Sequence, residues 1–172
     1  MTYNLHPIFA HFPIALLFLY SIIKIIPLRK WFPGVAWKDI ERTLLLIGFL
    51  GAYAALSTGG TAARLVHPNR ELTHMHSTFG RATIWIFGIL LLGELAAFIN
   101  AELRARGKSW GVISAILIWI ERILCHPAVS VVLALVGLLA LSVTGLLGGV
   151  IAYGLTADPL APYVIHLLGI NL

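Results

Sequence analysis

Four long runs of apolar residues, separated by short polar segments, dominate the chain. They cover residues 7–26, 43–63, 76–100 and 129–153. Each run approaches or exceeds the roughly 20 apolar residues that a helix needs to cross the hydrocarbon core of a bilayer. Because a backbone in lipid must satisfy its own hydrogen bonds, such runs predict membrane-spanning helices. We therefore expect an all-α fold: an integral membrane four-helix up-and-down bundle, forming a single transmembrane domain over residues 1–172.

Two shorter apolar stretches complete the pattern. Residues 110–124 are too few for a comfortable span, and they favour a helix that lies in the membrane interface between the third and fourth spans. Residues 159–172 predict a short surface helix at the end of the chain. Neither stretch adds a crossing, so the expected number of spans stays at four.

Composition agrees with this class and excludes others. Hydrophobic residues make up 59% of the chain and charged residues only 11%, which is unlike a water-soluble domain. The net charge of +5 does not indicate a nucleic-acid partner, because the basic residues lie in short loops and form no patch interleaved with aromatic residues. Cys125 is the only cysteine, which excludes an internal disulfide and a cluster of thiolate metal ligands.

The distribution of basic residues predicts the orientation in the membrane. The connections after the first and third spans, counted with Lys24 at the end of the first span, carry nine Lys and Arg, whereas the connection after the second span, counted with Arg81 at the start of the third, carries three. Short cytoplasmic loops are enriched in these residues, so we expect a multi-pass protein of the bacterial inner membrane with both termini extracytoplasmic. All seven histidines except His126 then lie on the extracytoplasmic side.

Two histidines near the starts of the first and third spans are the candidate functional residues. A histidine inside a membrane helix is costly unless it has a partner, so it marks a possible functional site. His11 follows the His6-Pro7 entrance, and Pro13 is expected to bend the helix beside it. In an up-and-down bundle the first and third helices are diagonal and run in the same direction. We therefore expect His11 and His76 to face each other through the bundle interior.

Small residues around this pair favour a flat cofactor. Ala15 and Gly80 follow the two histidines by four residues on the same helix faces, and the nearby halves of the second and fourth spans are rich in Gly, Ala, Ser and Thr. Opposed imidazoles between thin walls predict one haem b, with His11 and His76 as axial ligands and Arg81 as propionate partner. The expected function is electron transfer near the extracytoplasmic side, with a quinone or a periplasmic redox carrier as partner. This expectation favours an electron-transfer protein over a self-contained enzyme.

The remaining histidines leave a second chemical interpretation open. The secondary ligand candidates are His6, His67, His74 and His166. A copper or zinc ion is the alternative cofactor because imidazole suits both metals. Its candidate ligands are His6, His11, His74 and His76. Such a site needs three or four rings around one ion.

Glu94, inside the third span, belongs to further alternatives. In a metal-ion transport protein this carboxylate would mark the path of the ion, and it is also a candidate proton relay. A simpler interpretation pairs it with Arg122 or His126. From a different class, the chain would be a non-redox scaffold or accessory subunit of a larger membrane complex, whose histidines contact only water and headgroups.

Two motifs carry a resemblance. Residues 6–16 read HPIFAHFPIAL, and residues 144–149 read TGLLGG. Together with His76 and Tyr153, they resemble a bacterial family of four-helix integral membrane proteins of unknown function with an N-terminal HPxxxHFPIAL motif. Members are sometimes fused to Rieske-type iron–sulfur domains, so the resemblance implies redox work in a membrane. The resemblance covers most of the chain except residues 110–124.

This chain departs from the family pattern at two positions. The pattern has a histidine where this chain has Leu146, and an acidic residue where it has Val150. If that histidine binds a cofactor in the family, the resemblance implies that this chain holds fewer sites or uses another residue such as His166.

Overall fold

Four long helices form the body of the protein. The structure is a computed structural model that describes residues 6–66 and 69–170. Its long helices are α1 (His6–Ile25), α3 (Trp37–Val66), α4 (Arg70–Ala105) and α6 (Pro127–Tyr153). All four are long and apolar enough to cross a membrane, and the described residues contain no β-strand. The expected four-helix membrane bundle is confirmed.

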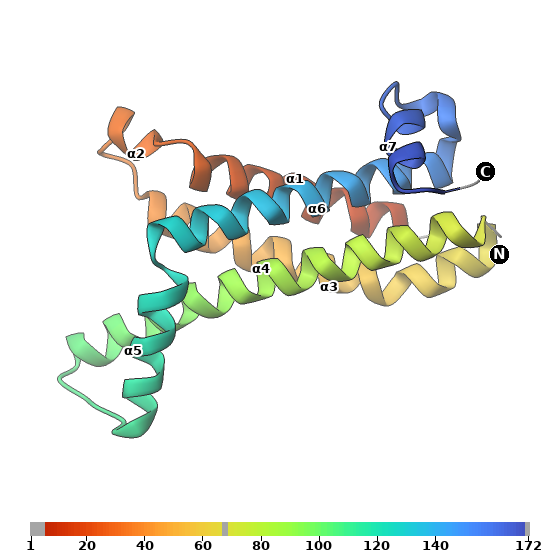
Figure 1. The fold of residues 1–172 in the computed structure, drawn as a ribbon. Coiled ribbons are helices and arrows are strands. Elements are labelled where there is room, and N and C mark those ends of the chain that lie inside the picture. Colours follow the sequence, from red (N-terminus) through yellow and green to blue (C-terminus); the bar gives the residue numbers. More distant parts are fainter. Residues whose placement is uncertain (1–5, 67–68, 171–172) are drawn as a thin grey trace.

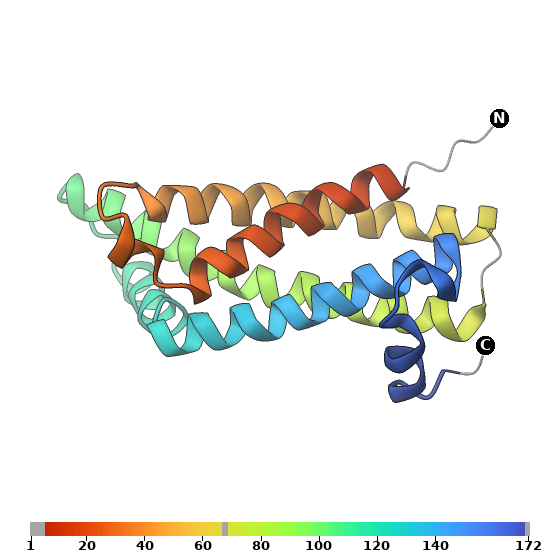
Figure 2. The ribbon, with the colours of Figure 1, turned by 90° about the horizontal axis from the view of Figure 1, so that it is seen from above.

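The helices alternate in direction and form a four-cornered bundle (Figures 1 and 2). Helix α1 packs against α3 and α6, and α4 packs against the same two helices. Therefore α1 and α4 occupy diagonal corners, as the up-and-down topology predicts. The start of α1, the start of α4 and the end of α6 lie at one end of the bundle, which we call the histidine end.

The long helices extend beyond the apolar runs. Helix α4 begins at Arg70, six residues before the expected span, because Asn69 caps it. The Asn69 side-chain oxygen accepts hydrogen bonds from the backbone N–H groups of Glu71 and Leu72, at 2.9 and 3.1 Å. Such a cap satisfies donors that have no partner within the helix. Polar residues can therefore continue the helix outside the apolar run.

Shorter helices lie at both ends of the bundle. They are α2 (Leu28–Trp31), α5 (Val112–Leu124), the 3₁₀ turn η1 (Leu155–Ala157) and α7 (Ala161–Leu167). Helix α5 projects sideways from the bundle at the end opposite to the histidines (Figure 1). It exposes Ile113, Ile116 and Trp119. These features are typical of a helix lying in the interface.

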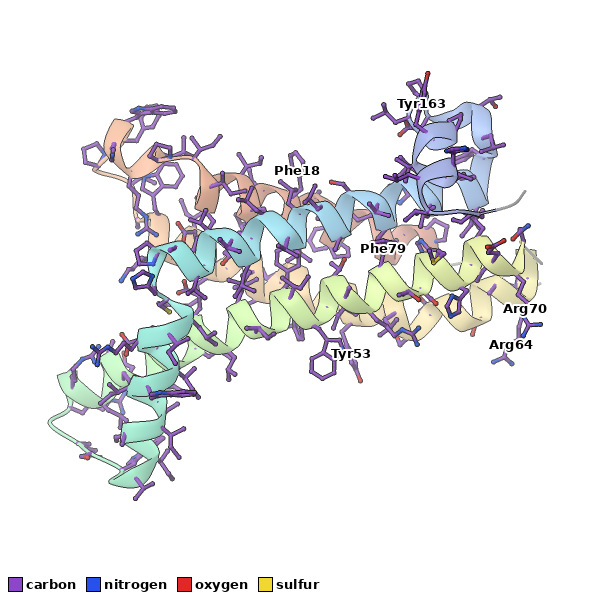
Figure 3. All side chains as sticks on the ribbon, viewed as in Figure 1. Phe18, Tyr53, Arg64, Arg70, Phe79 and Tyr163 are labelled. Carbon is purple, nitrogen blue, oxygen red and sulfur yellow. The ribbon has the colours of Figure 1, made fainter. Side chains whose placement is uncertain are left out.

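The middle of the bundle is a hydrophobic core. Tyr20 and Phe87 are fully buried and meet edge to face with ring centroids 6.1 Å apart. The other buried members of this layer are Leu17, Leu45, Leu90, Leu91 and Leu141. The outer faces carry large exposed apolar side chains such as those labelled Phe18 and Tyr53 in Figure 3, as expected of surfaces that face lipid.

Candidate functional site

Two imidazoles meet inside the histidine end of the bundle, and they belong to His6 and His76. Their ring centroids are 6.4 Å apart and their planes are nearly perpendicular, at 86°. His6 begins α1 and His76 lies in the second turn of α4, so the rings reach each other from diagonal corners. The structure therefore contains a cross-core histidine pair of the kind that the sequence predicts.

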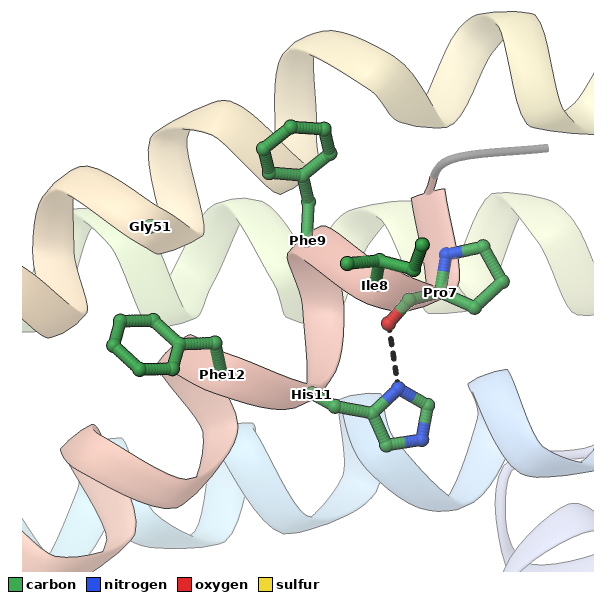
Figure 4. Close-up of a pocket in the computed structure, with 6 residues that line it drawn as sticks. All are labelled: Pro7, Ile8, Phe9, His11, Phe12 and Gly51. Carbon is green, nitrogen blue, oxygen red and sulfur yellow. Dashed lines mark hydrogen bonds between the residues drawn. The ribbon is translucent and has the colours of Figure 1, made fainter. Parts of the chain in front are cut away.

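Its first member is not the expected one. His11 has an exposed side chain whose Nδ1 lies 2.5 Å from the carbonyl oxygen of Pro7, one turn earlier. Its neighbours Ile8, Phe9 and Phe12 line a shallow apolar hollow on the outside of the bundle (Figure 4). The expectation that His11 faces His76 is therefore corrected.

Helix periodicity explains the correction. His11 follows His6 by five positions, so its side chain points about 140° around the helix axis from that of His6. His6 instead lies seven residues before Pro13, on the helix face that continues through Leu17 and Tyr20. Pro13, Leu17 and Tyr20 are buried. Positions seven apart share a helix face. His6 is thus on the core stripe and His11 is not.

A hydrogen bond orients each ring of the pair. His76 Nδ1 lies 3.0 Å from the carbonyl oxygen of Thr144 on α6, so this nitrogen must carry the proton and donate. His6 Nδ1 lies 3.1 Å from the hydroxyl oxygen of Thr58 on α3. The Thr58 hydroxyl also lies 3.2 Å from the carbonyl oxygen of Ala54 and 3.0 Å from that of Ala55, so when it donates its single proton to these carbonyls it accepts from His6. His76 therefore has its lone pair on Nε2, and so does His6 when its Nδ1 donates to Thr58. This is the tautomer that a metal-ligating histidine shows when its Nδ1–H is held by the protein.

Glycines on the two neighbouring helices make room for these rings. A Cβ atom built on Gly148 of α6 would lie 3.1 Å from His76 Cε1, tighter than an ordinary contact. A Cβ built on Gly59 of α3 would lie 3.5 Å from His6 Cε1. The small-residue segments of the second and fourth spans thus do adjoin the imidazoles. Ala15 is exposed, however, and Gly80 instead lies against Thr144, where a Cβ would be 3.7 Å from its methyl group.

The other expected site residues lie away from the pair. Arg81 is exposed on α4, and the side chains of His74 and His166 are exposed as well. His67 lies outside the described residues. Within residues 6–66 and 69–170, no three His, Cys, Asp or Glu side chains gather closely enough to hold a metal ion. The four-histidine copper or zinc centre is therefore not formed.

A buried ionic cluster occupies the opposite end of the bundle. Lys24 Nζ lies 3.0 Å from Glu41 Oε2 and 3.3 Å from Glu94 Oε1, so it joins α1 to α3 and α4. Arg29 Nη2 lies 2.7 Å from Glu41 Oε1, and the guanidinium of Arg42 lies 3.9 Å from Glu94 Oε2. The side chains of Glu41 and Glu94 are only 3% and 11% exposed. Glu94 thus pairs with Lys24 and Arg42. The interpretation that pairs it with Arg122 or His126 is corrected.

Cys125 lies beside this cluster, at the junction of α5 and α6. Its sulfur would be 3.5 Å from a Cβ built on Gly93, and the residue is half-buried. Burial raises the pKa of the Cys125 thiol, and the negative charge of Glu94 raises this pKa further. Since the thiolate is the reactive form, Cys125 is an inert packing residue at neutral pH.

These features define the protein as a multi-pass helical membrane protein with a histidine pair across its core. Residues 2–158 match a family described as "Predicted membrane protein (DUF2231)". The match covers most of the chain, so the protein belongs to the DUF2231 family. No curated protein and no solved structure was found to match it.

Proposed function

We propose that this protein carries electrons in the membrane through one haem b, with His6 and His76 as the axial ligands. The observation that carries the proposal is the separation of their imidazoles across the bundle, 6.4 Å between centroids. With metal–nitrogen bonds of about 2 Å and roughly 1 Å from each nitrogen to its ring centre, two imidazoles on opposite sides of one metal ion lie about 6 Å apart. The pair therefore has the spacing of a bis-histidine centre.

The surroundings of the rings agree with a ligand role. The carbonyl oxygen of Thr144 accepts a hydrogen bond from His76 Nδ1, and the Thr58 hydroxyl lies within hydrogen-bond distance of His6 Nδ1. These contacts fix the ring orientation and, where Nδ1 donates, increase the basicity of Nε2. His6 and His76 come from diagonal helices, so a group held between them would also adjoin α3 and α6, where Gly59 and Gly148 lie. When bound, a haem supplies a one-electron couple between ferrous and ferric iron. The protein supplies the two ligands, the hydrogen bonds that orient them and the small residues that leave room beside them.

Orientation and partners belong to the same proposal. The excess of Lys and Arg in the first and third connections favours an inner-membrane protein with the histidine end on the extracytoplasmic side. A haem there would exchange electrons with a quinone or with a periplasmic carrier. Arg64 and Arg70 lie at this end (Figure 3), where their positive charges are available for haem propionates or an acidic partner.

The visible spectrum of the purified protein tests this function. We expect reduced-minus-oxidised haem bands in the wild type, their loss in His6→Ala and His76→Ala, and their retention in His11→Ala and His74→Ala. The last two variants are matched controls because both histidines are exposed at the same end of the bundle. A wild-type protein that stays colourless when produced with ample haem would overturn the proposal, and loss of the bands in His11→Ala alone would overturn the ligand assignment.

A further inference from the structure

Helix α5 has an apolar face that the rest of the described chain does not cover. No residue of this helix is buried, and the exposed fractions along the face range from 38% to 76%. Glu121 lies on the opposite side of α5 and contacts α4 through the side chains of Asn100 and Arg104. The residues of the α5 apolar face, which recur at intervals of four, three and four and so share one side of the helix, are Val112, Ile116, Trp119 and Ile123. In a membrane protein, such a face is covered by lipid or by another protein.

The direction of α5 suits the surface of a bilayer. In both views the helix runs across the bundle axis and not along it (Figures 1 and 2). Since the four long helices cross the membrane, a helix perpendicular to them lies in the membrane plane, here at the level where α6 begins at Pro127. Helix α2 lies at the same end of the bundle and exposes Trp31 and Phe32 next to the exposed Lys30. Tryptophan and basic residues are enriched at the membrane interface, so two separate elements mark this level as the interface.

Two positive charges beside the α5 apolar face are available to an anion. Residues 101–126 contain four basic and two acidic side chains. Arg104 and Arg106 already pair with the two acids, at 3.8 and 3.1 Å. Lys108, in the loop before α5, and Arg122, in its last turn, are exposed and make no ion pair with any residue that the structure describes. An unpaired cation therefore lies near each end of the helix.

We propose that α5 and the loop before it bind anionic phospholipid, with the α5 apolar face among the acyl chains and Lys108 and Arg122 on headgroup phosphates. A helix of this kind binds a membrane by burying its apolar face and by attracting anionic lipid. Trp110 and Trp119 are 54% and 65% exposed, and their rings suit the headgroup level. A second copy of the chain is the weaker occupant, because two copies meeting symmetrically at α5 would bring the same unpaired cations together. The proposal depends neither on haem nor on which side of the membrane this end faces.

Quenching of tryptophan fluorescence by brominated lipid tests the proposal. The whole protein is placed in mixed vesicles of phosphatidylglycerol and phosphatidylcholine, in which one lipid or the other has brominated chains. The difference between wild type and Trp119→Phe gives the signal of Trp119. We expect brominated phosphatidylglycerol to quench Trp119 more than brominated phosphatidylcholine does, and high salt to reduce this preference. Lys108→Gln and Arg122→Gln should each lower the preference by about fivefold, whereas Arg81→Gln, which removes an exposed cation elsewhere on α4, should keep it.

Three results would overturn the proposal. If neither brominated lipid quenches Trp119, protein covers the α5 apolar face, and a dimer on cross-linking in the vesicles would identify a second copy as the occupant. If both lipids quench Trp119 equally in wild type, the helix lies in lipid without selecting its charge. If Arg81→Gln lowers the preference as much as Lys108→Gln does, the preference comes from the net charge of the protein and not from α5. The salt dependence of wild type decides the question even if a variant does not fold, because a preference that salt leaves unchanged is not electrostatic.

Discussion

Gly148 controls how much room the His76 ring has. In Gly148→Ala the new methyl group would lie 3.1 Å from His76 Cε1, so the ring must shift away from its hydrogen bond to Thr144. We expect haem content to fall several-fold and stability to fall by about 1–3 kcal/mol, the usual cost of overpacking. Gly149→Ala is the matched control, because nothing lies within 4 Å of its Cβ position. Haem content by pyridine haemochrome and the thermal unfolding midpoint check both variants, and equal behaviour of the two would contradict the packing argument.

The thiol of Cys125 gives a prediction on pH. Burial raises its pKa, so at a pH where a free thiol is half ionised Cys125 remains mostly protonated. We expect maleimide to label it more slowly than free cysteine at neutral pH, with the difference narrowing as the pH rises above about 8.5. The unfolded chain in detergent is the control, and it should label at the ordinary rate. Equal labelling rates for folded and unfolded protein would contradict the assignment.

Which histidine enters the core was predictable in part from the sequence. The apolar runs, the diagonal helices and His76 followed from hydropathy and topology. The sequence favours His11 because Pro13 predicts a bend that re-aims it, and it leaves His6 a secondary candidate. The seven-residue interval from His6 through Pro13 to Tyr20 is the signal that identifies the buried face. The hydrogen bonds to Thr58 and Thr144 could not be predicted, because they depend on the register between helices.

Helix α5 depends on one close approach to α4. A Cβ built on Gly93 would lie 2.7 Å from the Cβ of Leu124 and 3.6 Å from its carbonyl carbon, so no side chain fits there without moving the α5–α6 junction. Gly93→Ala should therefore lower the unfolding midpoint and speed proteolysis in the loop that precedes α5. Gly60→Ala is the control, because its Cβ position is open and alanine favours helix. Unchanged proteolysis in Gly93→Ala would show that α5 is held by other contacts.

Polar contacts also join α5 to α4. Asn100 Nδ2 donates to Glu121 Oε2 at 2.7 Å, and Arg104 lies 3.8 Å from the same oxygen. The sequence predicts α5 as an interfacial helix from its length and apolar character, but it gives no pairing for Glu121. Pairings between helices are the least predictable level, since the sequence offers Arg122 or His126 as one interpretation of the partner of Glu94, whereas Lys24 and Arg42 are its partners. Hydropathy places a charged residue along a helix, whereas packing selects its partner.

At the scale of the whole molecule, α1 and α4 meet across the core at both ends. Lys24 follows His6 by 18 residues, and Glu94 follows His76 by 18 residues. This interval is about five helical turns, or about 27 Å, so each helix presents both residues on one face. The Tyr20–Phe87 contact lies between them. Two polar pairs therefore fix the register of the same two helices, with a hydrophobic layer in the middle.

Lys24 is the residue on which the charged end depends. In Lys24→Met, the remaining ion-pair contacts among the described residues are the 3.9 Å contact of Glu94 with Arg42 and the pair of Glu41 with Arg29. Removing one partner of a buried ion pair typically costs about 3–5 kcal/mol, whereas an exposed pair such as Glu102–Arg106 is worth about 0.2–1 kcal/mol. We expect Lys24→Met to lower the free energy of unfolding far more than Arg106→Gln, as measured by thermal or denaturant unfolding in nanodiscs.

A double substitution separates loss of the pair from loss of packing. If the cost of Lys24→Met comes from leaving the Glu94 carboxylate uncompensated, then Lys24→Met with Glu94→Gln should recover part of it, because the unpaired charge is gone. Independent sites would instead add their costs. Additive costs would mean that the Lys24 side chain stabilises the bundle through its aliphatic packing, and that the two diagonal helices are not joined by charge at this end. Partial recovery would show that the ion pair sets their register.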